Sequence, residues 1–188
     1  MLKVATQAEW LRRVVEKFDG FLLDHAACER KASATALTFV SHYPDRAELV
    51  AAMIQLAREE LDHFQQVYQQ IASRGLQLGA DTKDVYVLRM RDQIRRGSDF
   101  YLLDRLLVAG IVEARGCERF GMLAEALPVG RIKDLYRALS RSEANHHRLF
   151  VDLARRYFPF EQVETRVEEL LDAEAQIVEE LPIRAALH

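Results

Sequence analysis

Two short stretches of the sequence place a glutamate three residues before a histidine. Residues 140–150, SRSEANHHRLF, contain Glu143 and His146, and residues 58–64, REELDHF, contain Glu60 and His63. At this spacing in an α-helix the carboxylate and the imidazole lie side by side. Either pair alone could be a chance surface contact, but carboxylate and imidazole together are side chains that bind iron or manganese.

Both pairs lie within the apolar stripe of their segment. The apolar residues in line with them are Met53, Leu56, Val67 and Ile71 around the first pair, and Leu135, Leu139, Phe150 and Leu153 around the second. Burying a carboxylate and an imidazole there costs free energy unless their charge is compensated, and a bound metal would compensate it. His147 lies about 100° further round the helix than His146, so we expect it at the surface or beside the ligands.

Two further long segments each offer one inward glutamate. Glu29, in CERKA, is in line with Leu22, Ala26, Ala36 and Val40, and Glu113, in GIVEARGCERF, is in line with Leu106, Ala109, Gly110, Cys117 and Phe120. Glu118 is the rival on the same segment, but it points about 140° away from Glu113 and is expected in solvent. Glu29 precedes Glu60 by 31 residues and Glu113 precedes Glu143 by 30, so the chain repeats one pattern of Glu followed by Glu-x-x-His.

The repeated pattern yields four carboxylates and two imidazoles. The six residues are Glu29, Glu60, His63, Glu113, Glu143 and His146, the ligand set of a carboxylate-bridged di-iron or di-manganese helix bundle. Four carboxylates balance the charge of two divalent cations. Oxygen and imidazole ligands without thiolates favour iron or manganese over zinc, and we expect two iron ions, with manganese as the alternative. The remaining alternative is a bundle with buried ion pairs and no metal.

The segments that hold these residues are predicted to be helices. Capping residues, glycines and prolines delimit a short helix over residues 6–18, long helices over about 20–42, 46–74, 99–127 and 129–158, a short helix over 84–95, and a last acidic helix ending near Leu181. Thr6 and Asp45 are the expected N-terminal caps of the first and third helices. Four long helices with a longer connection over residues 75–98 predict an all-α four-helix bundle with a crossover, plus short N-terminal and C-terminal helices. We expect one domain over residues 1–188.

The composition is typical of a helical protein of the reducing cytoplasm. Hydrophobic residues make up 49% and charged residues 29% of the 188 residues, with 8 glycines and 4 prolines, which excludes a fibrous or disordered chain. No apolar run approaches the roughly 20 residues that span a bilayer, and the N-terminus lacks the apolar core of a signal peptide. Cys28 and Cys117 fit no zinc or redox spacing, so we expect a cytoplasmic protein without a membrane partner.

The stretches around the six residues resemble a known family. The ligand pattern is similar to that of the ferritin-like superfamily, and CERKA, REELDHFQQV, EARGCERF and SEANHHRLF resemble the tRNA 2-methylthio-isopentenyl-adenosine hydroxylases. The likeness extends from about Leu22 to Phe158. It implies a ferritin-like fold and a non-haem di-iron monooxygenase, an oxidoreductase that hydroxylates the isopentenyl group of a modified adenosine in the tRNA anticodon loop.

The resemblance also implies how the ligands share the metals. Glu60 and Glu143 would bridge two irons, Glu29 and Glu113 would bind one iron each, and His63 and His146 would complete the shell. The reaction would consume O2 and two electrons from a donor that the sequence does not identify. Hydroxylating an unactivated carbon requires an oxidant stronger than any side chain, so a redox metal has to supply it.

One segment combines positive charge with aromatic residues, as binding to an RNA loop requires. Residues 83–101 contain the basic residues Lys83, Arg89, Arg91, Arg95 and Arg96 and the aromatic residues Tyr86, Phe100 and Tyr101. The alternative is a solvated connecting helix whose aromatic rings pack on the bundle. The small residues Ala109, Gly110 and Gly116 would leave room for a prenyl group, although close helix packing explains them equally well.

Two other classes of protein fit the same residues. Within the superfamily, the alternative is an iron-oxidising or peroxide-consuming protein of the ferritin, rubrerythrin or manganese-catalase type, although the chain lacks the Cys-rich module usual in rubrerythrins. From a different class, the alternative is a metal-free helical interaction module whose inward charges are structural. Metal analysis separates this module from the enzymes, and product analysis on tRNA separates the hydroxylase from the other metalloproteins.

Overall fold

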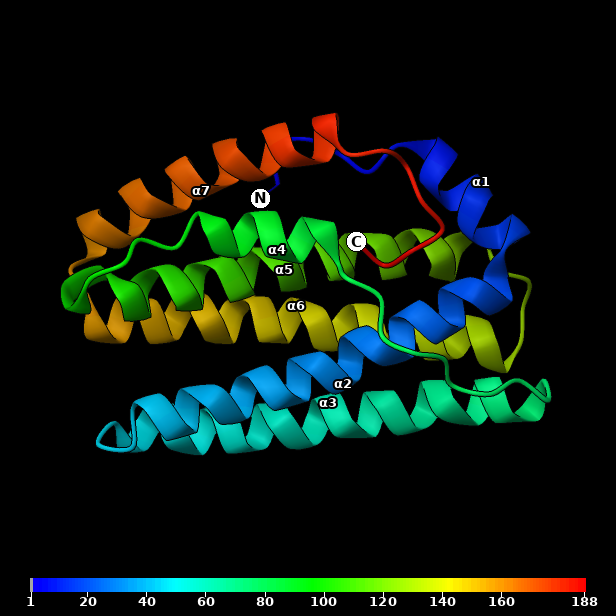
Figure 1. Ribbon diagram of the computed structural model, residues 1–188, viewed down its shortest axis with the longest axis horizontal. Coiled ribbons are helices and arrows are strands. Elements are labelled where there is room, and N and C mark those ends of the chain that lie inside the picture. The colour runs from blue at the N-terminus through cyan, green and yellow to red at the C-terminus, as the bar shows by residue number, and fades with distance from the viewer. Residues whose placement is uncertain (1) are drawn as a thin grey trace. The chain divides into compact units, whose positions relative to one another are not determined.

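All regular elements in the described part of the chain are α-helices. The computed structural model describes residues 2–188, apart from the side chains of Ser98 and Asp99. The helices within that range are α1 (Ala8–Glu16), α2 (Phe18–His42), α3 (Ala47–Ser73), α4 (Val85–Asp92), α5 (Ser98–Ala126), α6 (Arg131–Tyr157) and α7 (Phe160–Glu180) (Figure 1). None of these described helices is both long and apolar enough to cross a bilayer.

The contacts divide the chain into two compact units. The α2–α3 unit comprises residues 12–82 and 185–187, and the α5–α6 unit comprises residues up to 11 together with 83–184 and 188. The boundary passes through α1, so this short helix contributes residues to both units. The expectation of a single domain over the whole chain therefore stays a prediction.

The α2–α3 unit is an antiparallel helix pair. The two helices, coloured blue to cyan in Figure 1, pack along each other and are joined by a short turn. α3 is followed by Gly75, whose φ of 70° is a left-handed conformation that glycine adopts without steric cost. The segment after it returns to α2, where Arg30 pairs with Asp81.

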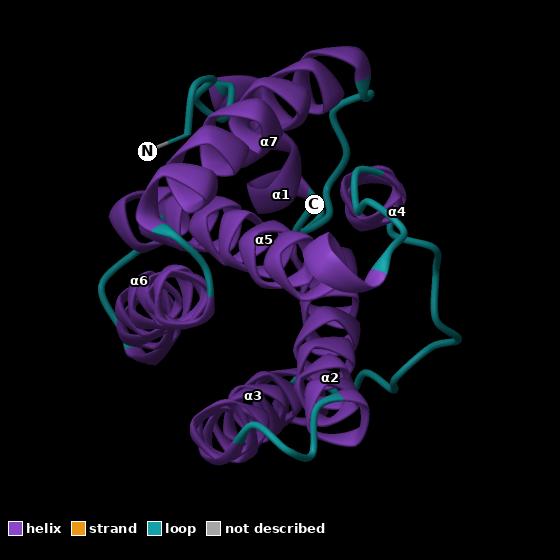
Figure 2. Ribbon diagram, turned by 90° about the vertical axis from the view of Figure 1, so that its left-hand side faces the viewer, coloured by secondary structure: helices purple, strands orange, loops and turns teal. Residues whose placement is uncertain are grey.

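The α5–α6 unit is built on a second antiparallel pair. α5 and α6 pack along each other, and α4 and α7 lie against α5 (Figure 2). The buried carboxylate of Asp104 on α5 accepts hydrogen bonds from Arg95, Nη2 at 2.7 Å, and from Arg166 on α7, Nη2 at 2.9 Å. Burial alone would raise the pKa of Asp104, but these two arginines outweigh it and lower the pKa. Asp104 therefore stays ionised and joins three segments.

The predicted helices are found within a few residues of their expected bounds, but the expected caps differ. α3 has Arg46 as its N-cap and no side-chain hydrogen bond there, so the predicted cap at Asp45 is wrong. α2 begins at Phe18 rather than Gly20. The hydroxyl of Thr6 donates to Glu118 Oε2 at 2.6 Å, a residue 112 positions away in sequence. Both caps were predicted from local spacing, whereas a tertiary partner determines what the Thr6 side chain contacts.

A buried polar network connects α4, α5 and α7 in the α5–α6 unit. Arg115 on α5 is fully buried and forms two hydrogen bonds with Glu174 on α7, Nε–Oε1 at 2.9 Å and Nη2–Oε2 at 3.0 Å. The Tyr86 hydroxyl donates to Glu174 Oε1 at 3.0 Å. Burial, followed by the charge of Glu174, raises the pKa of Tyr86 well above its ordinary value, so the phenol remains a neutral donor. The network holds α7 on the helix that contains Glu113.

We expect Glu174→Ala to lower the free energy of unfolding by about 3 kcal/mol, because it leaves the buried charge of Arg115 without its main counter-charge. Urea denaturation followed by circular dichroism measures the loss. Glu179→Ala is the matched control, since Glu179 lies on the same helix but is exposed, and it should change the value by less than about 0.5 kcal/mol. Equal small effects of the two substitutions would show that the network does not stabilise the unit.

Candidate metal centre

In the α2–α3 unit, two carboxylates and one imidazole gather in the apolar layer between the helices. Glu29 comes from α2, and Glu60 and His63 come from α3; all three are buried. One ligand atom from each lies within 4.8 Å of the other two. His63 Nδ1 lies 3.4 Å from Glu60 Oε2 and 3.7 Å from Glu29 Oε2. We call these three residues the α2–α3 triad.

The α5–α6 unit holds a second group of the same composition. Glu113 comes from α5, and Glu143 and His146 come from α6, with their ligand atoms again within 4.8 Å of one another. His146 Nδ1 lies 3.0 Å from Glu143 Oε2, and both side chains are buried. Glu113 is half-buried. We call these residues the α5–α6 triad.

The apolar stripes that predicted the triads are buried as expected. The buried members are Met53, Leu56, Val67 and Ile71 on α3 and Leu135, Leu139, Phe150 and Leu153 on α6. On the partner helices, Val40 and Ala109 are only half-buried. Because residues three apart on a helix share a face, each histidine is buried together with the glutamate that precedes it. Each apolar layer thereby holds a carboxylate and an imidazole from the same helix.

The geometry of each triad fits one metal ion. Two ligand atoms about 2.1 Å from a common metal ion are about 3.0 Å apart at a right angle and about 4.2 Å apart when opposite. The measured separations, 3.0 Å in the α5–α6 triad and 3.4 and 3.7 Å in the α2–α3 triad, fall within that range. Carboxylate oxygen and imidazole nitrogen without sulfur suit iron or manganese. The donor set and its spacing are thus compatible with the expected metals.

His25 is a buried residue near the α2–α3 triad that the sequence analysis did not assign. Its Nε2 lies 2.5 Å from Glu29 Oε1, and its side chain is completely buried. A metal-binding carboxylate is commonly oriented by a hydrogen bond from a neighbouring side chain, and His25 is placed to orient Glu29 in this way. The signal was present in the sequence, because His25 precedes Glu29 by one helical turn on the same stripe as Ala26.

His147 lies apart from the α5–α6 triad, as predicted. Its Nδ1 is 2.7 Å from the carbonyl oxygen of Gly110, to which it donates a hydrogen bond between α6 and α5. A Cβ atom added to Gly110 would lie 3.2 Å from Phe150 Cβ, so this glycine permits a close approach of the two helices. Close packing therefore explains Gly110 better than room for a prenyl group. Gly116 differs, because a Cβ added there would lie 3.9 Å from Glu143 Cγ.

Glu118 is not part of the triad but is not in solvent either. Its carboxylate accepts hydrogen bonds from the Thr6 backbone N–H at 3.0 Å and from Arg115, and only 27% of its side chain is exposed. The expectation of a solvent-exposed Glu118 is therefore wrong. Helix phase correctly separated it from Glu113, but the N-terminal segment and Arg115 cover it.

The predicted RNA-binding segment divides into two groups. Arg89 pairs with Glu180 at 2.5 Å and Arg95 with Asp104 at 2.7 Å, so these two arginines hold the α5–α6 unit together. Lys83, Arg91 and Arg96 are exposed. Among the aromatic residues, Tyr86 is buried, while Phe100 and Tyr101 are 40% and 38% exposed and lie under the guanidinium groups of Arg95 and Arg105.

Comparison with known proteins relates the whole chain to one family. The family model described as tRNA-(MS[2]IO[6]A)-hydroxylase (MiaE) matches residues 1–188. The tRNA 2-(methylsulfanyl)-N(6)-isopentenyladenosine(37) hydroxylase of Pseudomonas putida is 33% identical over 176 residues, which cover 93% of this chain and 84% of that protein. The protein of the same name from Salmonella typhimurium is 30% identical over 155 residues, covering 82% of this chain and 56% of that protein.

A solved structure is also similar over the full length. Protein 43 with aldehyde deformylating oxygenase activity from Synechococcus has a TM-score of 0.94 and 36% sequence identity, and the match covers 100% of this chain and 94% of that one. This likeness confirms the predicted all-α, ferritin-like fold class. Together with the match of the family model over every residue, it leads to one conclusion. The chain belongs to the tRNA-(MS[2]IO[6]A)-hydroxylase (MiaE) family.

Proposed function

We propose that this protein is a di-iron monooxygenase that hydroxylates the isopentenyl group of 2-methylthio-isopentenyl-adenosine in tRNA. The observation on which the proposal depends is that a member of this hydroxylase family has two triads, each with two carboxylates and one imidazole, in which every member except the half-buried Glu113 is buried. Two electrons and O2 are required as co-substrates, and the electron donor is a separate protein or reductant. A tRNA-modifying role is consistent with a cytoplasmic location.

The proposal requires the two triads to form one centre for two iron ions. The charge supports it, because four carboxylates balance two divalent cations. The resemblance to the hydroxylase family implies that Glu60 and Glu143 would be the ligands shared by both ions, and both carboxylates are buried. Glu29 with His63, and Glu113 with His146, would then each complete the shell of one ion. Manganese would fit the same donors.

The protein's own groups would hold the metals and keep the site dry. When bound, the irons supply the activation of O2 that no side chain can perform. Phe150 and Leu139 are buried on the same helix face as Glu143 and His146, and such apolar neighbours would limit the access of water to the metal ligands. His25 orients Glu29. A Cβ added to Gly116 would lie in ordinary contact with Glu143 Cγ, at 3.9 Å, and we propose that the prenyl group approaches the metal ligands on this side.

The activity is tested with tRNA that bears the unhydroxylated nucleoside. The iron-loaded protein is incubated with this tRNA, O2 and a chemical reductant, and the nucleosides are analysed by mass spectrometry after digestion. A mass increase of one oxygen atom, about 16 Da, on the isopentenyl group is the expected result. Two bound metals without any change in the tRNA would favour an iron-oxidising or peroxide-consuming protein, and no bound metal would favour the interaction module.

A second candidate function follows from the likeness to Protein 43. That protein is named for aldehyde deformylating oxygenase activity and shares 36% identity over the whole of this chain. The two activities differ in substrate, so parallel assays separate them. Release of formate from a long-chain aldehyde, with unchanged tRNA, would favour the second candidate. Turnover of tRNA without formate release would favour the first.

The ligand assignment on α5 is tested by comparing Glu113→Ala with Glu118→Ala. We expect the first to lower bound iron by about half and to reduce hydroxylation at least about 100-fold, because it removes a metal ligand. The second should keep the iron but lower the free energy of unfolding by about 2 kcal/mol, since Arg115 and Thr6 lose a partner. Metal analysis and urea denaturation give the two readouts. Loss of iron only in the Glu118 variant would refute the assignment.

We propose that tRNA contacts the exposed part of residues 83–101. The exposed cations Lys83, Arg91 and Arg96 would contact phosphates, and the half-exposed rings of Phe100 and Tyr101 would offer stacking surfaces. Arg89 and Arg95 are assigned a structural role instead, because each pairs with a carboxylate of its own unit. The variant that tests RNA binding should therefore replace only exposed cations and leave Arg89 and Arg95 unchanged.

Replacing Arg91 and Arg96 together by Gln is expected to raise the KM for tRNA about tenfold at low salt. It should also reduce the slope of log affinity against log salt concentration by about 1–2, because two phosphate contacts are lost. Arg95 is left intact, so that its bonds to Asp104 do not change. The matched control is Arg137→Gln with Arg141→Gln, which removes two exposed charges from α6. A salt slope that changes only in the control would place the RNA surface on α6.

A further inference from the structure

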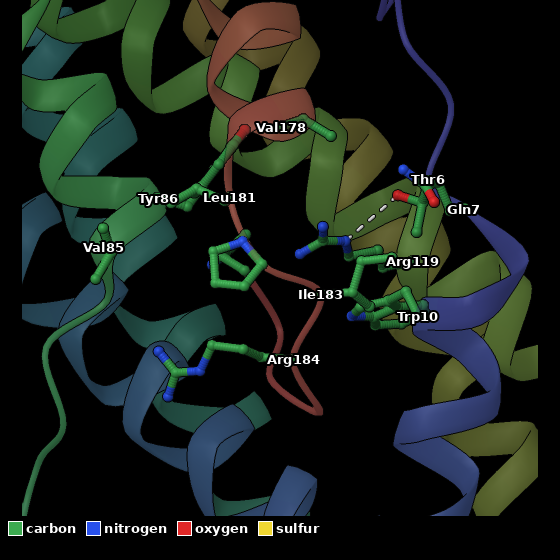
Figure 3. Close-up of a pocket in the computed structure, with 12 residues that line it drawn as sticks. Thr6, Gln7, Trp10, Val85, Tyr86, Arg119, Val178, Leu181, Ile183 and Arg184 are labelled. Atoms are coloured by element: carbon green, nitrogen blue, oxygen red, sulfur yellow. Dashed lines mark hydrogen bonds between the residues drawn. The ribbon is translucent and has the colours of Figure 1, made fainter.

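The α5–α6 unit contains a cavity that is separate from the residues of both triads. Its volume is about 140 Å³, close to that of the cavities of about 150 Å³ that accommodate benzene. The lining residues are Thr6, Gln7, Trp10, Val85, Tyr86, Arg119, Val178, Leu181, Pro182, Ile183, Arg184 and His188. They come from the start of the chain, from α4, α5 and α7, and from the segment after α7 (Figure 3).

Most of the cavity wall is apolar and aromatic. Trp10 and Tyr86 are buried, with 3% and 2% of their surface exposed. Tyr86 stacks on the ring of His188 at a centroid distance of 5.1 Å and an interplanar angle of 11°. The hydroxyl of Tyr86 donates to Glu174, so its polar end has a partner within the α5–α6 unit. Such walls suit a flat, apolar ligand.

Two arginines, Arg119 and Arg184, line the cavity. The imidazole of His188 also lines it, and its Nδ1 lies 3.1 Å from Asp84 Oδ2. The guanidinium of Arg119 lies 5.1 Å from the centre of the Trp10 ring, its Nε donates to Thr6 Oγ1 at 3.4 Å, and only 8% of the residue is exposed. Figure 3 shows this guanidinium pointing into the cavity on the side of Tyr86. Arg184 is exposed at the edge.

The buried position of Arg119 has an electrostatic consequence. Burial, and to a smaller extent the nearby charge of Arg115, lower the pKa of Arg119 to about 10. The charges of Glu118 and Glu174 raise the pKa of Arg119 and offset part of the cost of burial. A further anion at the guanidinium would offset more of it. A guanidinium fits a carboxylate in particular, because its two parallel N–H groups match the two oxygens.

We propose that this cavity binds a small carboxylate with a flat apolar body of about the size of a benzene ring. The carboxylate would pair with Arg119, and the body would lie between Trp10, Tyr86 and the apolar side chains of Val178 and Leu181. Inorganic phosphate lacks the apolar body, and an uncharged aromatic lacks the anion, so neither should bind comparably. The site is independent of the proposed hydroxylase activity, because none of its residues belongs to a triad.

Benzoate is the probe, and the iron-loaded protein is the sample. At ten times its dissociation constant, benzoate should raise the Tm by about 3 °C, with saturation at a concentration on the order of 1 mM. Benzyl alcohol and phosphate at the same concentrations should shift the Tm by less than a third as much. A Tm shift with phosphate as large as that with benzoate would show that the site binds anions in general. A Tm shift with benzyl alcohol as large as that with benzoate would show that Arg119 has no role in binding. Either result overturns the proposal.

Two variants locate the binding. Arg119→Gln should lower the affinity for benzoate at least about tenfold, since a charge-assisted hydrogen bond is lost. Val178→Phe keeps Arg119 but fills the cavity, and it should abolish the Tm shift with benzoate. This variant tests the proposal independently if Arg119→Gln fails to fold. Val129→Phe is the matched control, because Val129 is 96% exposed and outside the cavity. Benzoate binding that survives Val178→Phe unchanged would place the ligand elsewhere and overturn the proposal.

Discussion

Replacing Glu60 or Glu143 by alanine is expected to reduce bound iron from two atoms per chain to fewer than about 0.5 and to lower tRNA hydroxylation more than about 100-fold. Each carboxylate is proposed to bind both ions, so its loss removes a ligand from two coordination shells at once. The two side chains are only 1% and 2% exposed, and solvent cannot easily replace them. Iron is measured by inductively coupled plasma mass spectrometry on protein purified under reducing conditions.

Two control substitutions separate ligand loss from damage to the helices. Glu59→Ala alters the neighbour of Glu60, a half-buried residue that accepts from Gln55 at 2.7 Å. Asn145→Ala alters an exposed residue two positions after Glu143. Both controls should retain the iron and the circular dichroism of the wild type. Full iron occupancy in the Glu60 and Glu143 variants would refute the shared-ligand assignment, whatever their activity.

His146→Ala is expected to impair iron binding and O2 consumption, whereas His147→Ala is expected to lower only the stability of the protein. The first removes an imidazole that lies 3.0 Å from Glu143, so it should weaken one iron and lower the rate of O2 consumption at least about 100-fold. The second removes a hydrogen bond to the Gly110 carbonyl, which costs about 1 kcal/mol of stability but leaves the metal ligands in place. Metal analysis, O2 consumption and urea denaturation distinguish the two effects.

The adjacent positions make this pair a direct test of helix phase. Both residues lie in the same turn of α6, so general damage to the helix would affect the two variants alike. His147→Gln is a useful third variant, because an amide can still donate to Gly110 and should restore part of the stability. If His147→Ala loses iron while His146→Ala keeps it, the assignment of ligands on α6 is wrong.

Several features could be predicted from the sequence because they depend on local periodicity. The bounds of α2, α3, α5 and α6 follow from prolines, glycines and the 3.6-residue repeat of apolar side chains. The same repeat predicts that Glu60 with His63, and Glu143 with His146, are buried on one face. Each triad could therefore be assembled from residue types and spacing, and the structure brings its three members within 4.8 Å of one another.

Other features could not be predicted from the sequence, because they depend on which segments meet in space. Asp45 has the right spacing for a cap that the structure does not use, and Thr6 contacts Glu118 and Arg115 from α5 instead of remaining a purely local residue. Helix phase separated Glu118 from Glu113, but only the folded chain shows the N-terminal segment that covers it. The pairing of Arg89 with Glu180 and of Arg95 with Asp104 likewise joins segments that the sequence does not show to be neighbours.

The sequence by itself determined the helices, the apolar stripes and the six candidate ligands, since all three depend on contacts between residues three or four positions apart. Only the tertiary structure decided the pairing of Arg115 with Glu174 and the cavity at Arg119, whose walls combine residues from Thr6 to His188. The physical reason is that a repeat along one helix specifies which face is buried, but not which distant segment covers it. Charge pairs and cavities form between such segments, so their partners become visible only when the chain is folded.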